Sequence, residues 1–238
     1  MCIRDSKAFR IGLGPFGLMN LTGPPIALHS TDYLAEQLNT PRYMGAGNLR
    51  ALVEAGEMWP IEDDSAYDEA TYAAVSERLL GVVFGVAAQI VEEDVCSMED
   101  VDRGAKVGLR WAKGPFELMN RVGLKEAHRM ASAYAELAAG GWSVPDFFTR
   151  QAAGEEGWDF SYVDVHMDDG IATITINRPE AMNALNETVV DQLGQAVAKV
   201  HAAEGIHTMV LDGAGKAFVA GADVKFFVDK IRADAIPD

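Results

Sequence analysis

The heptapeptide Gly-Pro-Phe-Gly-Leu-Met-Asn at residues 14–20 returns as Gly-Pro-Phe-Glu-Leu-Met-Asn at residues 114–120. Self-similarity at a fixed spacing indicates that one structural unit is present twice. The second copy follows a long helical stretch that the first copy lacks, so we expect the chain to begin within a domain. Further identities at the same spacing are Arg10 and Arg110, Gly23 and Gly123, Ala27 and Ala127, Ala35 and Ala135, and Glu36 and Glu136.

The repeated motif is typical of a turn that leads into a helix. Its glycine permits a tight bend, its proline presets φ, and its phenylalanine, leucine and methionine suit a core. We therefore predict that residues 14–20 and 114–120 share one conformation. Asn20 and Asn120 are expected to cap a backbone end.

Residues 12–17 formally match the Gly-x-Gly-x-x-Gly fingerprint of dinucleotide-binding loops. That fingerprint needs a preceding strand and free N–H groups at the start of a helix. No strand pattern precedes these residues, and Pro15 removes one N–H donor. We expect no NAD binding at this stretch.

The composition bounds the class of protein. The chain has 49% hydrophobic and 24% charged residues, and its net charge of −16 argues against nucleic acid, whose partners need a basic surface. The longest apolar run, residues 79–88, is about half of the ~20 residues that a membrane span needs, so we expect a buried helix and no membrane contact. Neither cysteine nor histidine spacing indicates a metal site, and without a signal pattern the expected location is cytoplasmic.

Changes in sequence pattern divide the chain into four segments. We predict a truncated first helical unit at 7–60, a second helical unit at 65–150, a linker at 151–160 and an α/β segment at 161–238. In the second unit, capping boxes at 65–68 and 97–100 predict helix starts, the first opening a helix to about residue 91. Gly81 and Gly85 predict a close approach by another helix. The expected core includes Val82, Val86, Phe116 and Leu118.

The α/β segment opens with alternating apolar and polar residues at 162–167. An Asp-Gly hairpin turn at 168–170, a strand at 171–176, a helix at about 187–203 and a strand at 208–211 follow. Strand, helix and strand in this order predict a right-handed parallel crossover.

The helical units resemble the C-terminal domain of 3-hydroxyacyl-CoA dehydrogenases, on the paired Gly-Pro-Phe-x-Leu-Met motifs and on residues 92–102. Glu77-Arg78-Leu79 stands where that family's units open with Asn-Arg-Leu. The family's active-site Asn belongs to the opening helix of the first unit, which this sequence lacks. Glu77 departs from the pattern in the second unit, so no catalytic role passes to it.

Residues 170–186 and 211–225 resemble the start of an enoyl-CoA hydratase/isomerase, or crotonase-fold, domain. The second stretch is similar to that family's acyl-CoA loop. Its small residues suit a close approach of backbone to ligand, and a helix that starts near Asp223 would aim N–H groups at it. By resemblance, the Ala222 N–H is one of two donors to the thioester oxygen. The resemblance places the coenzyme A contacts at Ala184, Ala220, Gly221, Ala222, Asp223, Val224 and Lys225.

Losing one oxyanion donor typically costs ~3–4 kcal/mol of transition-state stabilisation. The family's second donor and its two catalytic glutamates belong to segments that this sequence lacks. Glu180 stands where many members carry a basic residue, which puts a phosphate contact there in doubt.

Together the resemblances imply a multidomain chain: an all-α dehydrogenase repeat pair followed by an incomplete α/β crotonase-fold domain. They point to the dehydrogenase-first bifunctional 3-hydroxyacyl-CoA dehydrogenase/enoyl-CoA hydratases of fatty-acid β-oxidation. The full-length parent would use NAD, act on acyl-CoA thioesters and form a homo-oligomer, while this chain alone would be inactive. The alternatives are a non-catalytic acyl-CoA-binding or assembly module and a crotonase-fold isomerase.

Overall fold

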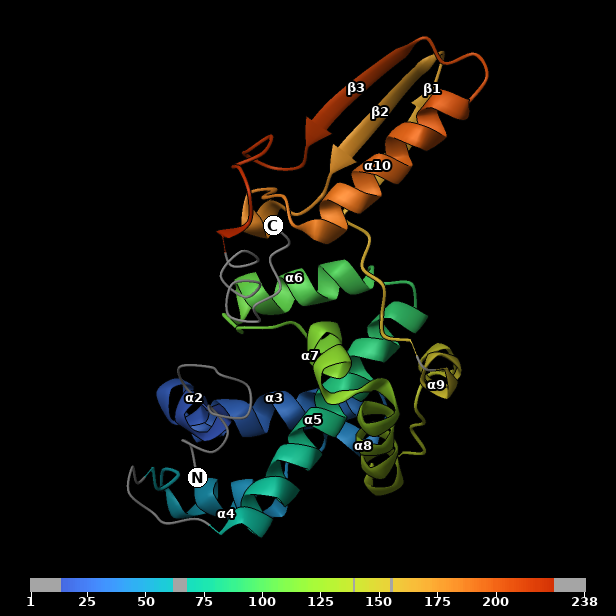
Figure 1. The fold of residues 1–238 in the computed structure, drawn as a ribbon. Helices are drawn as coiled ribbons and strands as arrows, with labels where there is room; N and C mark the ends of the chain where they lie inside the picture. Colours follow the sequence, from blue (N-terminus) through green and yellow to red (C-terminus); the bar gives the residue numbers. More distant parts are fainter. Residues whose placement is uncertain (1–13, 62–67, 139, 155, 225–238) are drawn as a thin grey trace. The chain divides into compact units, whose positions relative to one another are not determined.

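The computed structural model describes residues 14–61, 68–138, 140–154 and 156–224. The chain forms two compact units, Met1–Trp158 and Asp159–Asp238 (Figure 1). The described part of the first unit is helical, as the sequence predicts. Its elements are α2 (Pro15–Thr22), α3 (Pro24–Gln37), the 3-10 helix η1 (Pro41–Tyr43), α4 (Gly47–Ala55), α5 (Glu69–Glu92), α6 (Met98–Gly108), α7 (Pro115–Val122), α8 (Leu124–Leu137) and α9 (Asp146–Ala153).

The repeated heptapeptide has the same backbone conformation in both copies, as predicted. Gly14 precedes α2 at φ −73° and ψ 168°, and Gly114 precedes α7 at φ −74° and ψ 166°. Each short helix then turns into the next through a glycine of positive φ, 98° at Gly23 and 95° at Gly123. Because side chains disfavour positive φ, this turn depends on glycine.

The asparagine of each motif bonds the backbone of a distant tryptophan, so the backbone end that it caps lies beyond a later helix of the same copy. The Asn120 Nδ2 donates to the Trp158 carbonyl at 2.9 Å, and its Oδ1 accepts from the Trp158 N–H at 2.7 Å. Asn20 makes the same two bonds to Trp59, at 2.8 and 2.9 Å. We call each pair of bonds an Asn–Trp clamp.

The clamped indole rings pack on the phenylalanine of the same motif. The centroids of the Phe116 and Trp158 rings are 5.3 Å apart at 85°, and those of Phe16 and Trp59 are 4.7 Å apart at 67°. Both are edge-to-face arrangements, the geometry that the ring quadrupoles favour. Each clamp thus joins the motif to a residue that follows the last helix of its copy.

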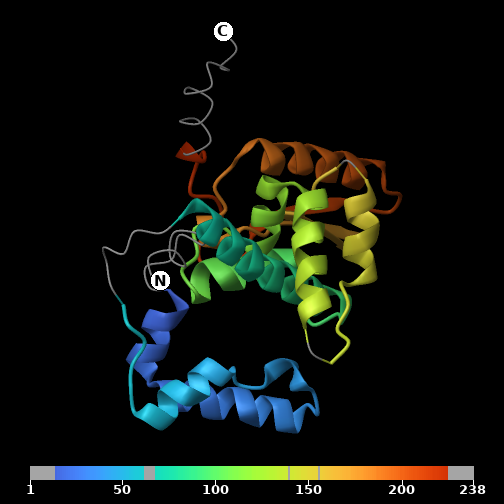
Figure 2. The same cartoon turned by 90° about the horizontal axis from the view of Figure 1, so that it is seen from below.

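The core of the second copy lies between α5, α7 and α8 (Figures 1 and 2). Phe116 and Leu118 are buried, as predicted, but Val82 and Val86 are only half-buried, so the prediction is wrong for them. The tightly packed face of α5 consists instead of small residues and Phe84. A Cβ at Gly81 would lie 2.3 Å from the Met130 carbonyl oxygen of α8, which confirms the expected close approach of a helix there, whereas a Cβ at Gly85 would meet the Trp142 ring, which belongs to no helix.

The starts of α6 and α5 test the capping predictions, and the end of α9 tests the predicted linker. Ser97 accepts from the Asp100 N–H at 3.2 Å and caps α6, as predicted. Ser65 lies outside the described residues, and Asp68 caps α5 by accepting from Thr71 N at 2.8 Å. The predicted linker is wrong at its start, because α9 continues through residues 151–153.

Helix α5 is apolar over most of its length. Among the described helices, it alone has the length and composition of a membrane span. In the structure Gly81 packs against α8, but only 28% of the apolar stretch of α5 is buried, so the helix is less buried than expected.

The second unit has the predicted strand, helix and strand. Its sheet runs β1 (Val163–Asp168), β2 (Ile171–Ile176) and β3 (Thr208–Gly213), with β1 antiparallel and β3 parallel to β2. Helix α10 (Glu187–Ala202) connects β2 to β3 and packs on the sheet (Figure 1). The core between them contains Ala172, Ile174, Ala196 and Val200.

We predict that Asn120→Ala lowers the unfolding free energy of the first unit by about 2–3 kcal/mol, because two backbone groups of Trp158 lose their partner. Asn20→Ala is the matched variant in the other copy. It should cost less, since Trp59 is half-buried whereas Trp158 is buried. Urea unfolding followed by tryptophan fluorescence measures both. Equal stability of Asn120→Ala and wild type would contradict the role of the clamp.

A second prediction concerns Asp102 of α6, which is buried and accepts from Phe116 N at 2.8 Å and Glu117 N at 2.9 Å. Burial raises the pKa of Asp102 to about 6 from its ordinary 3.8. A carboxyl whose pKa is higher in the folded than in the unfolded state stabilises the fold in its protonated form. The contribution of Asp102 to the unfolding free energy is therefore full below pH ~4 and is lost as the pH rises through ~6.

The difference in unfolding free energy between wild type and Asp102→Asn (wild type minus variant) should therefore decrease as the pH rises from 4 to 7. Titrations of the other groups cancel in this difference. A difference that stays constant or grows across this range would contradict the raised pKa.

Candidate acyl-CoA loop

The acyl-CoA loop predicted from sequence is held against the segment that follows β2. Leu185 N donates to the Gly221 carbonyl at 2.9 Å, and Asp223 N donates to the Leu185 carbonyl at 2.8 Å. These bonds make a parallel bridge between Leu185 and Ala222. Because bonding groups alternate along an extended chain, the N–H of Ala222 points away from Leu185. Ala222 itself is exposed, which is compatible with the predicted role of its N–H as an oxyanion donor.

One arginine joins the two sides of this loop. The Arg178 Nη1 donates to Asp223 Oδ2 at 2.8 Å and to the Ala184 carbonyl at 3.2 Å. The two charged side chains are only 19% and 16% exposed, so the pair is largely shielded from water. Arg178 thereby fixes Ala184 and Asp223, the residues expected on opposite sides of the coenzyme A arm, relative to each other.

A buried asparagine holds the base of the loop. The Asn183 Nδ2 donates to the carbonyls of Ala214 and Ala217 at 2.9 and 2.7 Å, and its Oδ1 accepts from Arg178 N at 2.9 Å. Asn183 has a φ of 55°, a left-handed conformation that asparagine tolerates better than most residues. Its amide replaces regular secondary structure as the partner of three backbone groups.

The sequence motif contained Arg178 and Asn183, but sequence reasoning assigned them no role. Their partners lie up to 45 residues away, so the pattern carried no signal of the contacts. The left-handed tolerance of asparagine at position 183 was the one available clue.

The structure brings most of the predicted contact residues to one place. Ala184, Ala220, Gly221, Ala222 and Asp223 lie at or next to the crossing of the two segments. Gly221 has a φ of 117°, which favours glycine. Val224 is exposed, and Lys225 and the helix expected from about Asp223 onward lie outside the described residues. The roles of these residues toward a substrate stay predictions.

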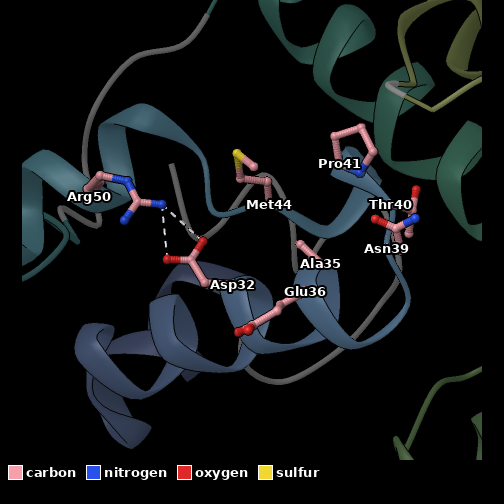
Figure 3. Close-up of a pocket in the computed structure, with 8 residues that line it drawn as sticks. All are labelled: Asp32, Ala35, Glu36, Asn39, Thr40, Pro41, Met44 and Arg50. Carbon is pink, nitrogen blue, oxygen red and sulfur yellow. Dashed lines mark hydrogen bonds and ion pairs between the residues drawn. The ribbon is translucent and has the colours of Figure 1, made fainter.

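The first unit contains a polar cavity of about 420 Å³ that the sequence did not predict (Figure 3). Asp32 accepts from Gly45 N at 3.0 Å and pairs with Arg50 at 2.9 Å. The Gly45 N–H and the Arg50 guanidinium lower the pKa of Asp32. This ion pair joins α3 to α4, so the charged residues that line the cavity are explained by their role in holding these helices together.

An apolar cavity of about 470 Å³ is lined by residues of α5 and α6, including Val82 and Val86. Its lining explains why these valines are less buried than predicted. Within the described part of the chain, no group of three His, Cys, Asp or Glu residues is placed to bind a metal.

Comparison with known families assigns both parts of the chain. Residues 75–152 match the model for the C-terminal domain of 3-hydroxyacyl-CoA dehydrogenase, and residues 171–237 match that for enoyl-CoA hydratase/isomerase. The dehydrogenase-type match precedes the hydratase-type match along the chain, and each covers less than half of it. The helical region and the partial crotonase-like sheet thus have the assignments expected from their motifs.

Relatives match the second domain. Among them are a probable enoyl-CoA hydratase, echA8, of Mycobacterium tuberculosis (39% identity over 71 residues, 30% of this chain and 28% of the relative) and a mevalonyl-coenzyme A hydratase of Beauveria bassiana (38% over 86 residues, 36% and 29%). A 1,2-epoxyphenylacetyl-CoA isomerase of Escherichia coli is 37% identical over 59 residues, 25% and 22% of the two chains. The matched segments span less than a third of each relative.

We predict that Arg178→Met speeds hydrogen exchange at the amides of Leu185 and Asp223 about tenfold or more, because the link that Arg178 makes between Asp223 and the Ala184 carbonyl is lost. Arg129→Met is the control, since Arg129 forms exposed ion pairs in the other unit. Exchange followed by NMR reports each amide. Wild-type rates at both amides in Arg178→Met would contradict the positioning role.

Proposed function

We propose that the chain is part of a dehydrogenase-first bifunctional enzyme of fatty-acid β-oxidation. Such an enzyme would hydrate a trans-2-enoyl-CoA and oxidise the resulting 3-hydroxyacyl-CoA with NAD. The observation that carries the proposal is the order of the two family domains within one polypeptide. A cytoplasmic location and a homo-oligomeric parent belong to the same proposal.

In this proposal, the Ala222 N–H binds the thioester oxygen of the substrate. Addition to the double bond places negative charge on that oxygen, and a donor that is already in position stabilises it. Arg178 and Asn183 hold the loop so that the Ala222 N–H stays directed outward. The small side chains at residues 220–222 allow the acyl-CoA to approach the protein backbone closely.

The proposal assigns NAD to the parent rather than to the described residues. Residues 12 and 13 of the fingerprint lie outside the described residues, and Gly14 and Pro15 lead directly into α2. Pro15 removes one N–H at the start of that helix, so this helix start has one donor fewer for a pyrophosphate.

A crotonase-fold isomerase is the second candidate. The resemblance to the Escherichia coli isomerase supports it, because that protein matches the same domain at nearly the same identity as the hydratases. Since one oxyanion loop serves several chemistries, the loop does not separate the two reactions.

The test is binding of crotonyl-CoA to the whole chain, observed by NMR. We predict shifts at the amides of Ala222 and Asp223 and none in α7 and α8. Free coenzyme A, which lacks the acyl carbonyl, should leave the Ala222 amide less shifted. If neither amide responds to saturating crotonyl-CoA, the proposed acyl-CoA function is wrong.

The same chain should bind without catalysing hydration. General acid–base catalysis typically contributes ~10²–10⁴-fold. Asp223 is the carboxylate beside Ala222 in the described loop, and it is paired with Arg178. Loss of the enoyl thioester absorbance measures turnover. Turnover that a single substitution in this chain abolishes would show that it contains a catalytic acid.

A further inference from the structure

The turns that follow α3 and α8 bring the two copies of the helical unit together. Arg42 follows α3 at the same distance along the chain as Trp142 follows α8. The Cζ atom of Arg42 lies over the Trp142 ring, 4.6 Å from its centroid. In the same two turns, a Cβ at Gly140 would lie 2.8 Å from Thr40 Oγ1. Equivalent positions of the two copies therefore meet, but with side chains of different chemistry.

The Trp142 ring is held by α5 of its own copy. A Cβ at Gly85 would overlap the ring, so this glycine makes room for the indole. One turn further along α5, Gln89 Oε1 accepts from Trp142 Nε1 at 2.8 Å. The Tyr134 ring lies beside the indole, with the two centroids 5.1 Å apart. We call Gln89, Tyr134 and Trp142 the Gln-Tyr-Trp cluster.

Arg42 makes a different contact with each member of this cluster. Its Nε donates to Tyr134 Oη at 3.0 Å, and its Nη1 donates to Gln89 Oε1 at 3.0 Å. Its guanidinium carbon lies over the Trp142 ring, an arrangement that attracts a cation to the ring face. Arginine combines a flat face that stacks on rings with a fork of N–H donors. The cluster therefore fits a guanidinium better than it fits an ammonium group.

The amide of Gln89 is held in the orientation that accepts Arg42. Its Oε1 accepts from both Trp142 Nε1 and Arg42 Nη1, so both lone pairs are used. Its Nε2 donates to Glu93 Oε1 at 2.6 Å. Because a carboxylate offers acceptors and no donor, this bond fixes which end of the amide faces Arg42. The acceptor of Arg42 is thus part of a hydrogen-bonded chain along α5.

The equivalent positions of the first copy carry other chemistry. Leu34 stands in α3 where Tyr134 stands in α8, and Arg42 itself stands where Trp142 does. Another first copy would therefore offer Arg42 neither the phenol nor the indole. It would also bring a like charge to the place where the indole lies, and like charges repel. The contact thus selects the second copy as the partner of the first.

We propose that Arg42 docks the first copy of the helical unit on the second, with the Gln-Tyr-Trp cluster as the acceptor site that selects its guanidinium. Arg42 is in this sense a positioning residue, because it sets the orientation of α2–α4 relative to α5–α9. Each copy has its own Asn–Trp clamp, so each should stay folded when the contact is lost. The inference is independent of the proposed acyl-CoA function.

Residual dipolar couplings of the backbone amides, measured in the whole chain, report the orientation of each copy. In wild type, the couplings of α2–α4 and α5–α9 should fit one alignment tensor. Arg42→Met should require two tensors, because the copies then reorient separately. Arg42→Lys keeps the charge but has neither the flat face nor the fork, so it should also require two. Arg150→Met, at an exposed position of α9, is the control and should keep one tensor.

A milder variant tests the contact without removing Arg42. Tyr134→Phe keeps the ring and removes only the hydroxyl that accepts from Arg42 Nε. Hydrogen exchange at that Nε–H, followed by NMR, should become about tenfold faster. Tyr43→Phe is the matched control, since the Tyr43 ring lies 5.6 Å from the same guanidinium while the acceptor of Nε is Tyr134. It should leave the rate unchanged.

A double-mutant cycle then shows whether Arg42 acts through Trp142. Arg42→Met should raise the unfolding equilibrium constant of the helical unit about tenfold in the wild-type background. It should raise it only about two- to threefold when Trp142→Leu is already present, because part of the contact is then gone. Urea unfolding followed by circular dichroism measures both.

Four results would each overturn the proposal. They are a single alignment tensor in Arg42→Met, a single tensor in Arg42→Lys, an unchanged Nε–H exchange rate in Tyr134→Phe, and equal effects of Arg42→Met in the two backgrounds of the cycle.

Discussion

The Asn–Trp clamp is the interaction on which the helical unit depends. In each copy, one asparagine side chain satisfies both backbone groups of a tryptophan 38 or 39 residues further along the chain. The tryptophan follows the last helix of its copy, where no regular secondary structure supplies partners. With its backbone fixed, the indole ring packs on the phenylalanine of the same motif that carries the asparagine. In each copy, two hydrogen bonds and one ring contact therefore join the motif to the segment that follows the last helix and to the core.

The same physical solution holds the predicted acyl-CoA loop of the second unit. A ligand-binding loop has to present backbone N–H groups outward, so it cannot bury them in a helix or sheet. Asn183 and Arg178 supply side-chain partners for the backbone around the loop, and a bridge at Leu185 and Ala222 adds strand-like bonding. In both units, a side-chain amide forms the hydrogen bonds to backbone N–H and C=O groups that a helix or sheet would otherwise provide.

Much of the fold followed from local sequence patterns. The repeated heptapeptide predicted two equal turns, Ser97 predicted a helix start, and the strand, helix and strand of the second unit matched their hydrophobic periods. Long-range partners could not be predicted: neither the clamp of Asn120 on Trp158 nor the pair of Arg178 with Asp223 leaves a trace at nearby positions. Periodicity also placed Val82 and Val86 in the core, but α8 packs on the small residues of α5, because glycine and alanine permit the closest approach. For the site, the sequence located the loop, and the structure supplied what holds it.

The most direct test of the account is the hydrogen exchange rate of the Trp59 and Trp158 backbone amides, measured residue by residue in the whole chain. Each of these amides follows a helix and has an asparagine side chain as its acceptor, so its protection reports the hydrogen bond of the clamp together with the burial of the tryptophan. The account predicts slow exchange at both tryptophans, slower at the buried Trp158 than at Trp59, and faster exchange at the exposed Met58 beside Trp59. Exchange of Trp158 at the rate of an unprotected peptide would contradict it.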